Sequence, residues 1–249
     1  YFYRLSIVNN SINSSSLNYI WKALKMGSIS QINFQPFTNV TRSKYVFEEI
    51  KNAIFAGKLT PGTSLKELKL AKQFDVSQSI IREAIFMLEQ VGLAAKIPHK
   101  GTSVTKLSDK EIKERIEVRT CLEKIACHKA IKNMSNEDFE HANELVKDIS
   151  KAQIKNLYYE ASIADLNFHR YLWKKSENEI LYKTLDQIAT PLFSLISVKR
   201  SINSQNLEEV MYSHEEYIKA LKAGKEKRID EIIYTHLTLS YKLAGIELE

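Results

Sequence analysis

Long hydrophobic runs are missing from this chain of 249 residues. Its apolar stretches are short and interrupted by charges, and none approaches the roughly 18 consecutive apolar residues that cross a bilayer. We therefore expect a cytoplasmic protein that has no membrane partner. Residues 1–40 also lack the apolar stretch and the small-residue cleavage site of a secretory signal. We treat them as an N-terminal extension from which nothing about function is predicted.

Cysteine is equally scarce, since the chain holds only Cys121 and Cys127. These two residues are six positions apart, which places them on different faces of a helix, so a disulfide between them is not expected. There is no Cys-x-x-Cys pair that would suggest a zinc site. Both cysteines are predicted to be small core residues in a reducing compartment.

Acidic residues are absent from the first 41 positions, and the positive charge gathers in the front of the chain. The net charge is +6, and positions 42–105 hold ten basic and six acidic residues, whereas positions 106–249 hold 23 and 24. A basic front part and a nearly neutral remainder predict that contacts with a polyanion belong to the front. Hydrophobic residues make up 44% of the chain, which is enough for folded cores.

The periodicity of residues 41–106 predicts three helices followed by two short strands. The helices are expected over 42–57, Leu65–Phe74 and Gln78–Val91, and the strands over Leu93–Ile97 and Thr102–Thr105. Ser77 and Gly92 stand where helix caps are expected. In the second helix, Leu68, Ala71 and Phe74 are predicted to lie on one stripe. This order of elements is typical of a winged helix-turn-helix.

Residues 107–249 show helical periodicity alone, which predicts an all-helical second domain. The helices are expected over 109–133, 136–155, 157–175, 178–200, 206–222 and 225–245, with caps at Ser108, Ser135 and Asn206. Pro191 is expected to kink or split the fourth of them. The predicted fold class is mainly α, with a winged helix-turn-helix over 41–106 and a bundle of about six helices over 107–249.

Three stretches of the front domain follow a recognisable pattern. They are Gly57-Lys58-Leu59-Thr60-Pro61-Gly62-Thr63-Ser64-Leu65, then Leu70-Ala71-Lys72-Gln73-Phe74-Asp75-Val76-Ser77, then Ile81-Arg82-Glu83-Ala84-Ile85. In order and spacing they resemble the GntR family of bacterial transcription regulators. The resemblance implies a homodimer that binds a two-fold symmetric operator in double-stranded DNA. Gln78 and Leu68-Lys69 depart from arginines common in the family, so we expect an operator unlike the commonest family site.

The start of the third helix is expected to enter the major groove. There Arg82 can bond guanine with two nitrogens and Gln78 can read adenine, although a salt bridge from Arg82 to Glu83 or Glu89 is an alternative. Other residues of the head are expected to contact phosphates or to let the wing approach a groove. The predicted DNA-contacting set is Lys69, Ser77, Gln78, Ser79, Arg82, Lys100 and Gly101.

One carboxylate and three imidazoles form a candidate metal site in the second domain. Asp165 and His169 are four positions apart and share a helix face, while His214 and His236 fall in the last two expected helices. Such ligands suit zinc, nickel or manganese. The stretch Arg119–Glu123 is similar to the R-x-x-L-E of FCD domains, and the metal-binding FCD subgroup carries an Asp and three His in these helices. No partner pattern accompanies His128 or His141, which are predicted to be ordinary surface or packing residues.

The expected function is a DNA-binding regulator, favoured to be a repressor, whose operator affinity changes when a small organic acid binds at the metal. Arg119 is the candidate clamp for the carboxylate of this effector, with a salt bridge to a Glu of another helix as the alternative. A purely structural metal also stays open, as does a metal-dependent hydrolase. No general base or nucleophile accompanies the four ligands, so we do not expect an enzyme.

Overall fold

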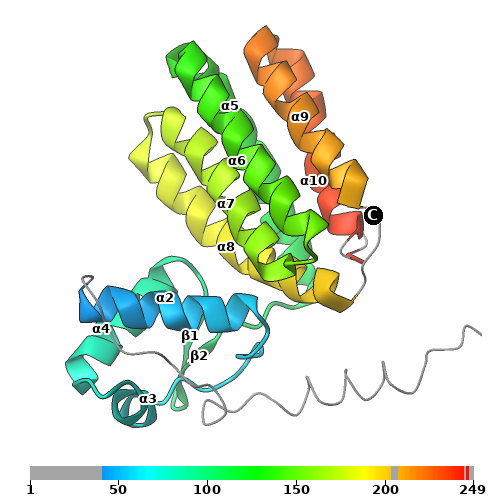
Figure 1. The fold of residues 1–249 in the computed structure, drawn as a ribbon. Coiled ribbons are helices and arrows are strands. Elements are labelled where there is room, and N and C mark those ends of the chain that lie inside the picture. The colour runs from blue at the N-terminus through cyan, green and yellow to red at the C-terminus, as the bar shows by residue number, and fades with distance from the viewer. Residues whose placement is uncertain (1–40, 203–206, 244, 247–249) are drawn as a thin grey trace, which may run out of the picture.

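The computed structural model describes residues 41–202, 207–243 and 245–246, which form a small head and a larger bundle of helices (Figure 1). The head contains α2 (Arg42–Phe55), α3 (Glu67–Phe74), α4 (Gln78–Gln90), β1 (Ala94–Ile97) and β2 (Gly101–Val104). The two strands pair antiparallel, with Ala94 opposite Val104 and Ile97 opposite Gly101. The order confirms the predicted winged helix-turn-helix fold.

Local chemistry sets the turn between α3 and α4. Asp75 ends α3 in the left-handed conformation at a φ of 51°, and the Ser77 hydroxyl accepts a hydrogen bond from the Ile80 backbone N–H at 3.4 Å. The predicted cap at Ser77 is therefore confirmed. The stripe predicted for α3 is not the buried face of this helix, because Leu70 and Ala71 are buried whereas Leu68 is 72% exposed. A rotation of 100° per residue carries position 68 away from the face that contains 70 and 71.

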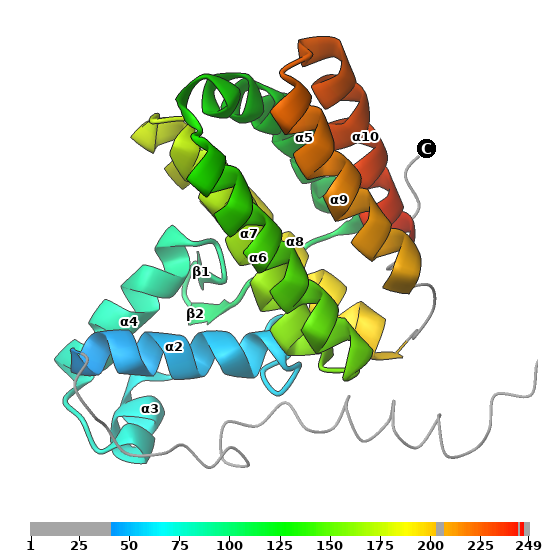
Figure 2. The same ribbon diagram turned by 45° about the horizontal axis from the view of Figure 1, so that its top comes forward.

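The bundle contains α5 (Asp109–Asn133), α6 (Asn136–Ile154), α7 (Tyr158–Lys175), α8 (Glu179–Ile202), α9 (Leu207–Ala223) and α10 (Glu226–Leu243). Capping boxes at Ser108 and Ser135 confirm two of the expected caps, whereas Asn206 lies outside the described residues. Helix α8 continues through Pro191, so of the two expected effects a split is excluded, and a kink stays a prediction. In Figures 1 and 2, α9 and α10 run side by side, and they pack against α5 and α6 of the same bundle.

The two cysteines lie in different environments. Cys127 is buried beside the Tyr217 hydroxyl, as predicted, and burial raises the pKa of its thiol above the ordinary value. Cys121 is exposed on the same helix, so the expectation that it belongs to the core is wrong. Among the described helices, none combines the length and the apolar character needed to cross a bilayer.

The head packs against α8 of the bundle. Apolar residues of both parts share one core, in which Phe55 and Leu93 of the head join Leu185 and Phe193 of α8. The Ser197 hydroxyl of α8 also donates a hydrogen bond to the carbonyl oxygen of Phe55 at 2.8 Å. We call the whole contact surface between the head and α8 the seam. It places α8 between the elements of the head and the interior of the bundle.

Candidate metal centre and DNA-contacting surface

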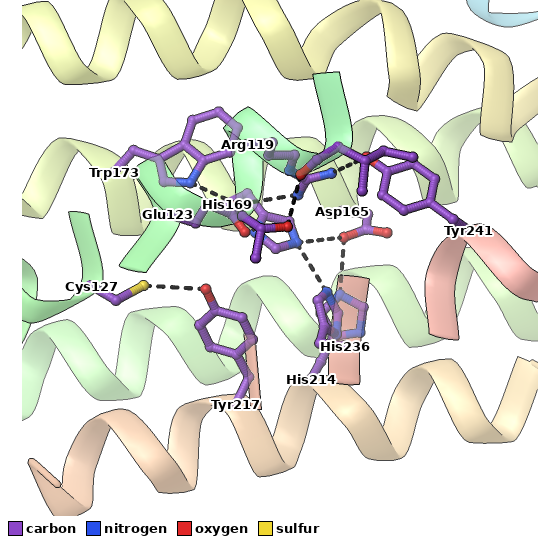
Figure 3. A network of polar contacts seen from close by, with 12 residues as sticks. Arg119, Glu123, Cys127, Asp165, His169, Trp173, His214, Tyr217, His236 and Tyr241 are labelled. Atoms are coloured by element: carbon purple, nitrogen blue, oxygen red, sulfur yellow. Dashed lines mark hydrogen bonds and ion pairs between the residues drawn. The ribbon is translucent and has the colours of Figure 1, made fainter. Parts of the chain in front are cut away.

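The four predicted metal ligands come together in the interior of the bundle. Asp165 and His169 project from α7, His214 from α9 and His236 from α10 (Figure 3). All four are at most 3% exposed, and one ligand atom from each lies within 4.8 Å of the others. Three helices that are far apart in sequence therefore supply one compact set of nitrogen and oxygen donors.

The distances between these donors fit a common ion. His214 Nε2 lies 2.9 Å from Asp165 Oδ1, His169 Nε2 lies 3.2 Å from His236 Nε2, and His169 Nε2 lies 3.5 Å from Asp165 Oδ1. Donors that surround one divalent ion at about 2.0–2.2 Å are separated by roughly 3–3.5 Å from their neighbours. The residues present therefore fit a first-row divalent metal in the type of their donors and in the spacing of these three pairs.

A second layer of polar side chains orients two of the imidazoles. Glu123 Oε1 lies 3.0 Å from His169 Nδ1, and the Ser213 hydroxyl lies 3.0 Å from His236 Nδ1. A partner on Nδ1 leaves Nε2 of each ring facing the centre, which is the usual arrangement around metal-binding histidines. Sequence reasoning missed both partners. The R-x-x-L-E stretch contained Glu123, but nothing in the sequence paired Ser213 with a residue 23 positions away.

The charges around the centre are unusual for a protein interior. Burial raises the pKa of Asp165, but His214 and His169 outweigh burial and hold it well below the ordinary value. Burial likewise raises the pKa of Glu123, yet Arg119 and His169 bring it down to about 2. Burial, with repulsion from His214 and His169, lowers the pKa of His236, which favours the neutral ring that binds metals.

Arg119 lies against the same network but is already engaged. Its Nη2 donates to Glu123 Oε1 at 3.1 Å, its Nη1 donates to the Tyr241 hydroxyl at 2.9 Å, and Phe193 covers the guanidinium. The partner Glu123 lies on the same helix, so the expected alternative of an inter-helix salt bridge is wrong. Three buried atoms of the network, Arg119 Nε, Glu123 Oε2 and His169 Nδ1, make no hydrogen bond to a described residue, and the contact of His169 Nδ1 with Glu123 Oε1 is an ion pair.

The residues predicted to contact DNA lie on the outside of the head. Those exposed are Lys69, Ser77, Ser79, Arg82, Lys100 and Gly101, whereas Gln78 is half-buried. Arg82 Nε donates to Glu67 Oε2 of α3 at 2.6 Å. Sequence reasoning missed this partner and named Glu83 or Glu89 instead. Glu89 accepts a hydrogen bond from Thr102 of the wing. Gly101 begins β2 at a φ of 82°, a conformation that favours glycine.

Comparisons with known proteins match both parts of the chain. Residues 42–104 match the family described as bacterial regulatory proteins, gntR family, and residues 114–239 match the FCD domain. Neither description names an enzyme, in agreement with the sequence-based expectation.

Curated relatives extend the match over most of the chain. A "Probable D-xylose utilization operon transcriptional repressor" of Paenarthrobacter nicotinovorans is 27% identical over 206 residues, which cover 82% of this chain and 88% of the relative. A gluconate operon transcriptional repressor of Bacillus licheniformis is 29% identical over 185 residues, covering 70% and 73%. The solved structure of McbR/YncC from E. coli has a similar fold, with a TM-score of 0.69 at 23% identity over 82% of this chain and 99% of that one.

Proposed function

Because the chain belongs to the GntR family of bacterial transcription regulators and carries an FCD domain, we propose that it is a repressor controlled by a small organic acid at a metal centre. The observation that carries this proposal is the buried set of one carboxylate and three imidazoles in the domain that packs against a DNA-binding head. The sensing domain is taken to be residues 107–249 and the DNA-binding domain residues 41–106.

The ion is zinc, nickel or manganese, held by Asp165, His169, His214 and His236. These donors suit all three metals, so availability in the cell decides which one is bound. A bound divalent ion would supply a Lewis acid that attracts a small carboxylate. Glu123 and Ser213 hold the rings of His169 and His236 so that their Nε2 atoms face the centre.

Buried charge supports a cation at this place. Asp165 and Glu123 are anionic in the interior, and Arg119 compensates one of them. The other needs either a proton on an imidazole such as His169, whose pKa is raised above its ordinary value, or a metal ion. An unpaired buried charge is strongly unfavourable, so the centre favours a cation when its imidazoles are neutral, the form that binds metals. A divalent ion meets this need and leaves a net positive charge that an anionic effector can neutralise.

The effector class follows from the same groups. A carboxylate would be held by the metal and by Arg119, whose unpartnered Nε is a donor that a ligand could engage. One relative is named for a gluconate operon, and gluconate is a sugar acid, which puts sugar acids first among the acids to be tested.

The regulator works on DNA as a homodimer in the cytoplasm, where it meets the nucleoid. Two heads present their α4 helices to the two halves of a symmetric operator. Arg82 and Gln78 read bases, while Lys69, Ser77, Ser79, Lys100 and Gly101 contact the backbone or groove. Effector binding changes the relative position of the two heads and thereby releases the operator.

The test is a thermal-shift screen of the metal-loaded protein against sugar acids, hydroxy acids and dicarboxylates. A ligand that binds the folded state alone raises stability by RT ln(1 + [L]/Kd), which is about 2.7 kcal/mol at 100 Kd. We expect at least one acid to raise the melting temperature, and the shift to disappear after chelation and in Arg119→Met. If no acid shifts a protein with confirmed metal content, the effector role is wrong.

A purely structural metal is the second candidate, and one observation favours it. All four ligands are almost fully buried and Arg119 is already paired, as in closed structural sites. For a structural metal, chelation lowers the melting temperature in the same screen although no acid raises it.

A further inference from the structure

Arg82 and Glu67 form a short contact between the two helices of the helix-turn-helix. Arg82 lies in the second turn of α4, and its Nε donates to Oε2 of Glu67, the first residue of α3, at 2.6 Å. The cap at Ser77 and the left-handed Asp75 hold the turn between these helices. The guanidinium is therefore tied to a fixed point outside its own helix.

Stability does not account for the position of Glu67. The side chains of Arg82 and Glu67 are 64% and 39% exposed, and exposed ion pairs add little to the free energy of folding. A carboxylate on a DNA-facing surface also repels phosphates and weakens binding to any duplex. The benefit of the contact must therefore be something other than folding stability or overall affinity for DNA.

The geometry offers such a gain. The hydrogen bond to Glu67 comes from Nε of Arg82, and no bond from Nη1 or Nη2 to another residue is found in the described part of the chain. These two nitrogens are the fork that matches the O6 and N7 acceptors of guanine. A free arginine samples many rotamers, and a tether on Nε reduces that freedom without occupying the fork.

We propose that Glu67 is a positioning residue that sets the base preference of this protein by holding Arg82 in a guanine-reading orientation. The inference rests on the proposed DNA-binding function and makes it more specific, since it assigns the guanine preference to a pair of residues on two helices. Glu67 itself touches no base. Glu67 increases the discrimination between DNA sequences, whereas its negative charge lowers the overall affinity for any duplex.

Glu83 provides a matched control. It is an exposed acid that directly follows Arg82 on α4, so Glu83→Gln removes the same charge from the same helix-turn-helix. The structure shows no contact between Glu83 and Arg82 within the described part of the chain. A purely electrostatic effect of Glu67 on DNA would therefore be reproduced by Glu83→Gln, whereas a positioning effect would not.

The experiment is selection from a library of DNA duplexes with a randomised central segment, using the full-length metal-loaded protein and sequencing the bound fraction. Wild type is expected to enrich a two-fold symmetric site with one guanine per half-site that Arg82→Ala no longer selects. A bidentate guanine contact corresponds to a preference of about 5- to 150-fold over other bases. Glu67→Gln is expected to reduce this preference at least about 3-fold at that position only, while binding to a scrambled duplex stays equal or becomes tighter.

Glu83→Gln should keep the wild-type preference, and Glu67→Gln should add nothing in the Arg82→Ala background, because the two residues act as one unit. Melting temperatures of all variants exclude misfolding, and Glu67→Asp, which keeps the charge on a shorter side chain, should lose preference as well. If Glu67→Gln keeps the guanine preference, or if Arg82→Ala does, the positioning role is overturned while DNA binding stands. If wild type enriches no sequence, the proposed function falls together with the inference.

Discussion

His214 tests the metal centre with a single residue. It is fully buried and its Nε2 lies 2.9 Å from Asp165 Oδ1, so His214→Ala removes one donor and leaves the carboxylate without its nearest partner. We expect Asp165→Ala and His214→Ala to lose bound metal, as measured by mass spectrometry of the desalted protein. His128 is the control, because it pairs with Asp230 away from the four ligands and is 28% exposed. Full metal content in the two ligand variants would contradict the site.

Ser213 tests the layer behind the ligands. Its hydroxyl bonds Nδ1 of His236, and loss of such a partner usually weakens metal affinity about 10- to 100-fold. We expect Ser213→Ala to show this weakening in a competition titration with a chelating dye. Ser240 is the control, since it is a buried serine of α10 with no hydrogen bond to the four ligands. Equal affinities in Ser213→Ala and wild type would show that the hydroxyl does not orient His236.

Residue types and spacing could predict the ligands but not their partners. The four-residue interval between Asp165 and His169 fixes a shared helix face whatever the tertiary structure, so that pair was accessible from the sequence. The contacts of Glu123 with His169 and of Glu67 with Arg82 join different helices. Such contacts depend on how each helix is rotated against its neighbour, which local periodicity does not determine.

The start of a helix could be predicted from the sequence where a capping serine marks it. Ser77, Ser108 and Ser135 each bond a backbone N–H three residues later, and each stands at the predicted start of a helix. Interior positions were harder to judge. Helix α3 has only 8 residues, so its period could not distinguish the buried Leu70 from the exposed Leu68.

The seam rests on a glycine of the head and a proline of α8. Pro191 has no N–H for the carbonyl of Gln187, and Arg115 Nη1 of α5 approaches that oxygen at 3.4 Å. Gly92 packs on the same spot, where an added Cβ would lie 2.6 Å from the Gln187 oxygen and 3.0 Å from Pro191 Cγ. The head can therefore dock on α8 only because position 92 has no side chain.

Gly92→Ala is expected to destabilise the protein more than Gly62→Ala. Both glycines have positive φ values, 74° and 86°, so both substitutions introduce backbone strain of about 1–2 kcal/mol. Only Gly92→Ala adds the clash at the seam, for which overpacking predicts about 1–3 kcal/mol more. Urea unfolding at fixed metal concentration measures both changes. Equal losses of unfolding free energy in the two variants would show that the seam accommodates the added methyl group without losing stability.

Helix α8 connects the two halves of the molecule. Phe193 lies 5.6 Å from the ring of His169, measured between ring centroids, and covers Arg119, while Pro191 and Ser197 of the same helix contact the head. A change at the metal centre can therefore reach the head through one continuous element. The sequence predicted a head and a bundle, but not their docking, because the shared core combines residues more than 100 positions apart.

Metal removal should destabilise the helices that carry the ligands more than the helices of the head. The four ligands connect α7, α9 and α10, so a bound ion cross-links these helices and stabilises the folded state by about 2.7 kcal/mol at 100 times its Kd. For a chain of this size, that energy corresponds to about 5–11 °C in melting temperature. We expect chelation to lower the melting temperature by this amount.

Hydrogen exchange should accelerate first in α7, α9 and α10, and later in α2 and α4. His214→Ala should not respond to the chelator, and zinc should restore wild type. Uniform acceleration along the chain, or none, would show that no ion connects these three helices.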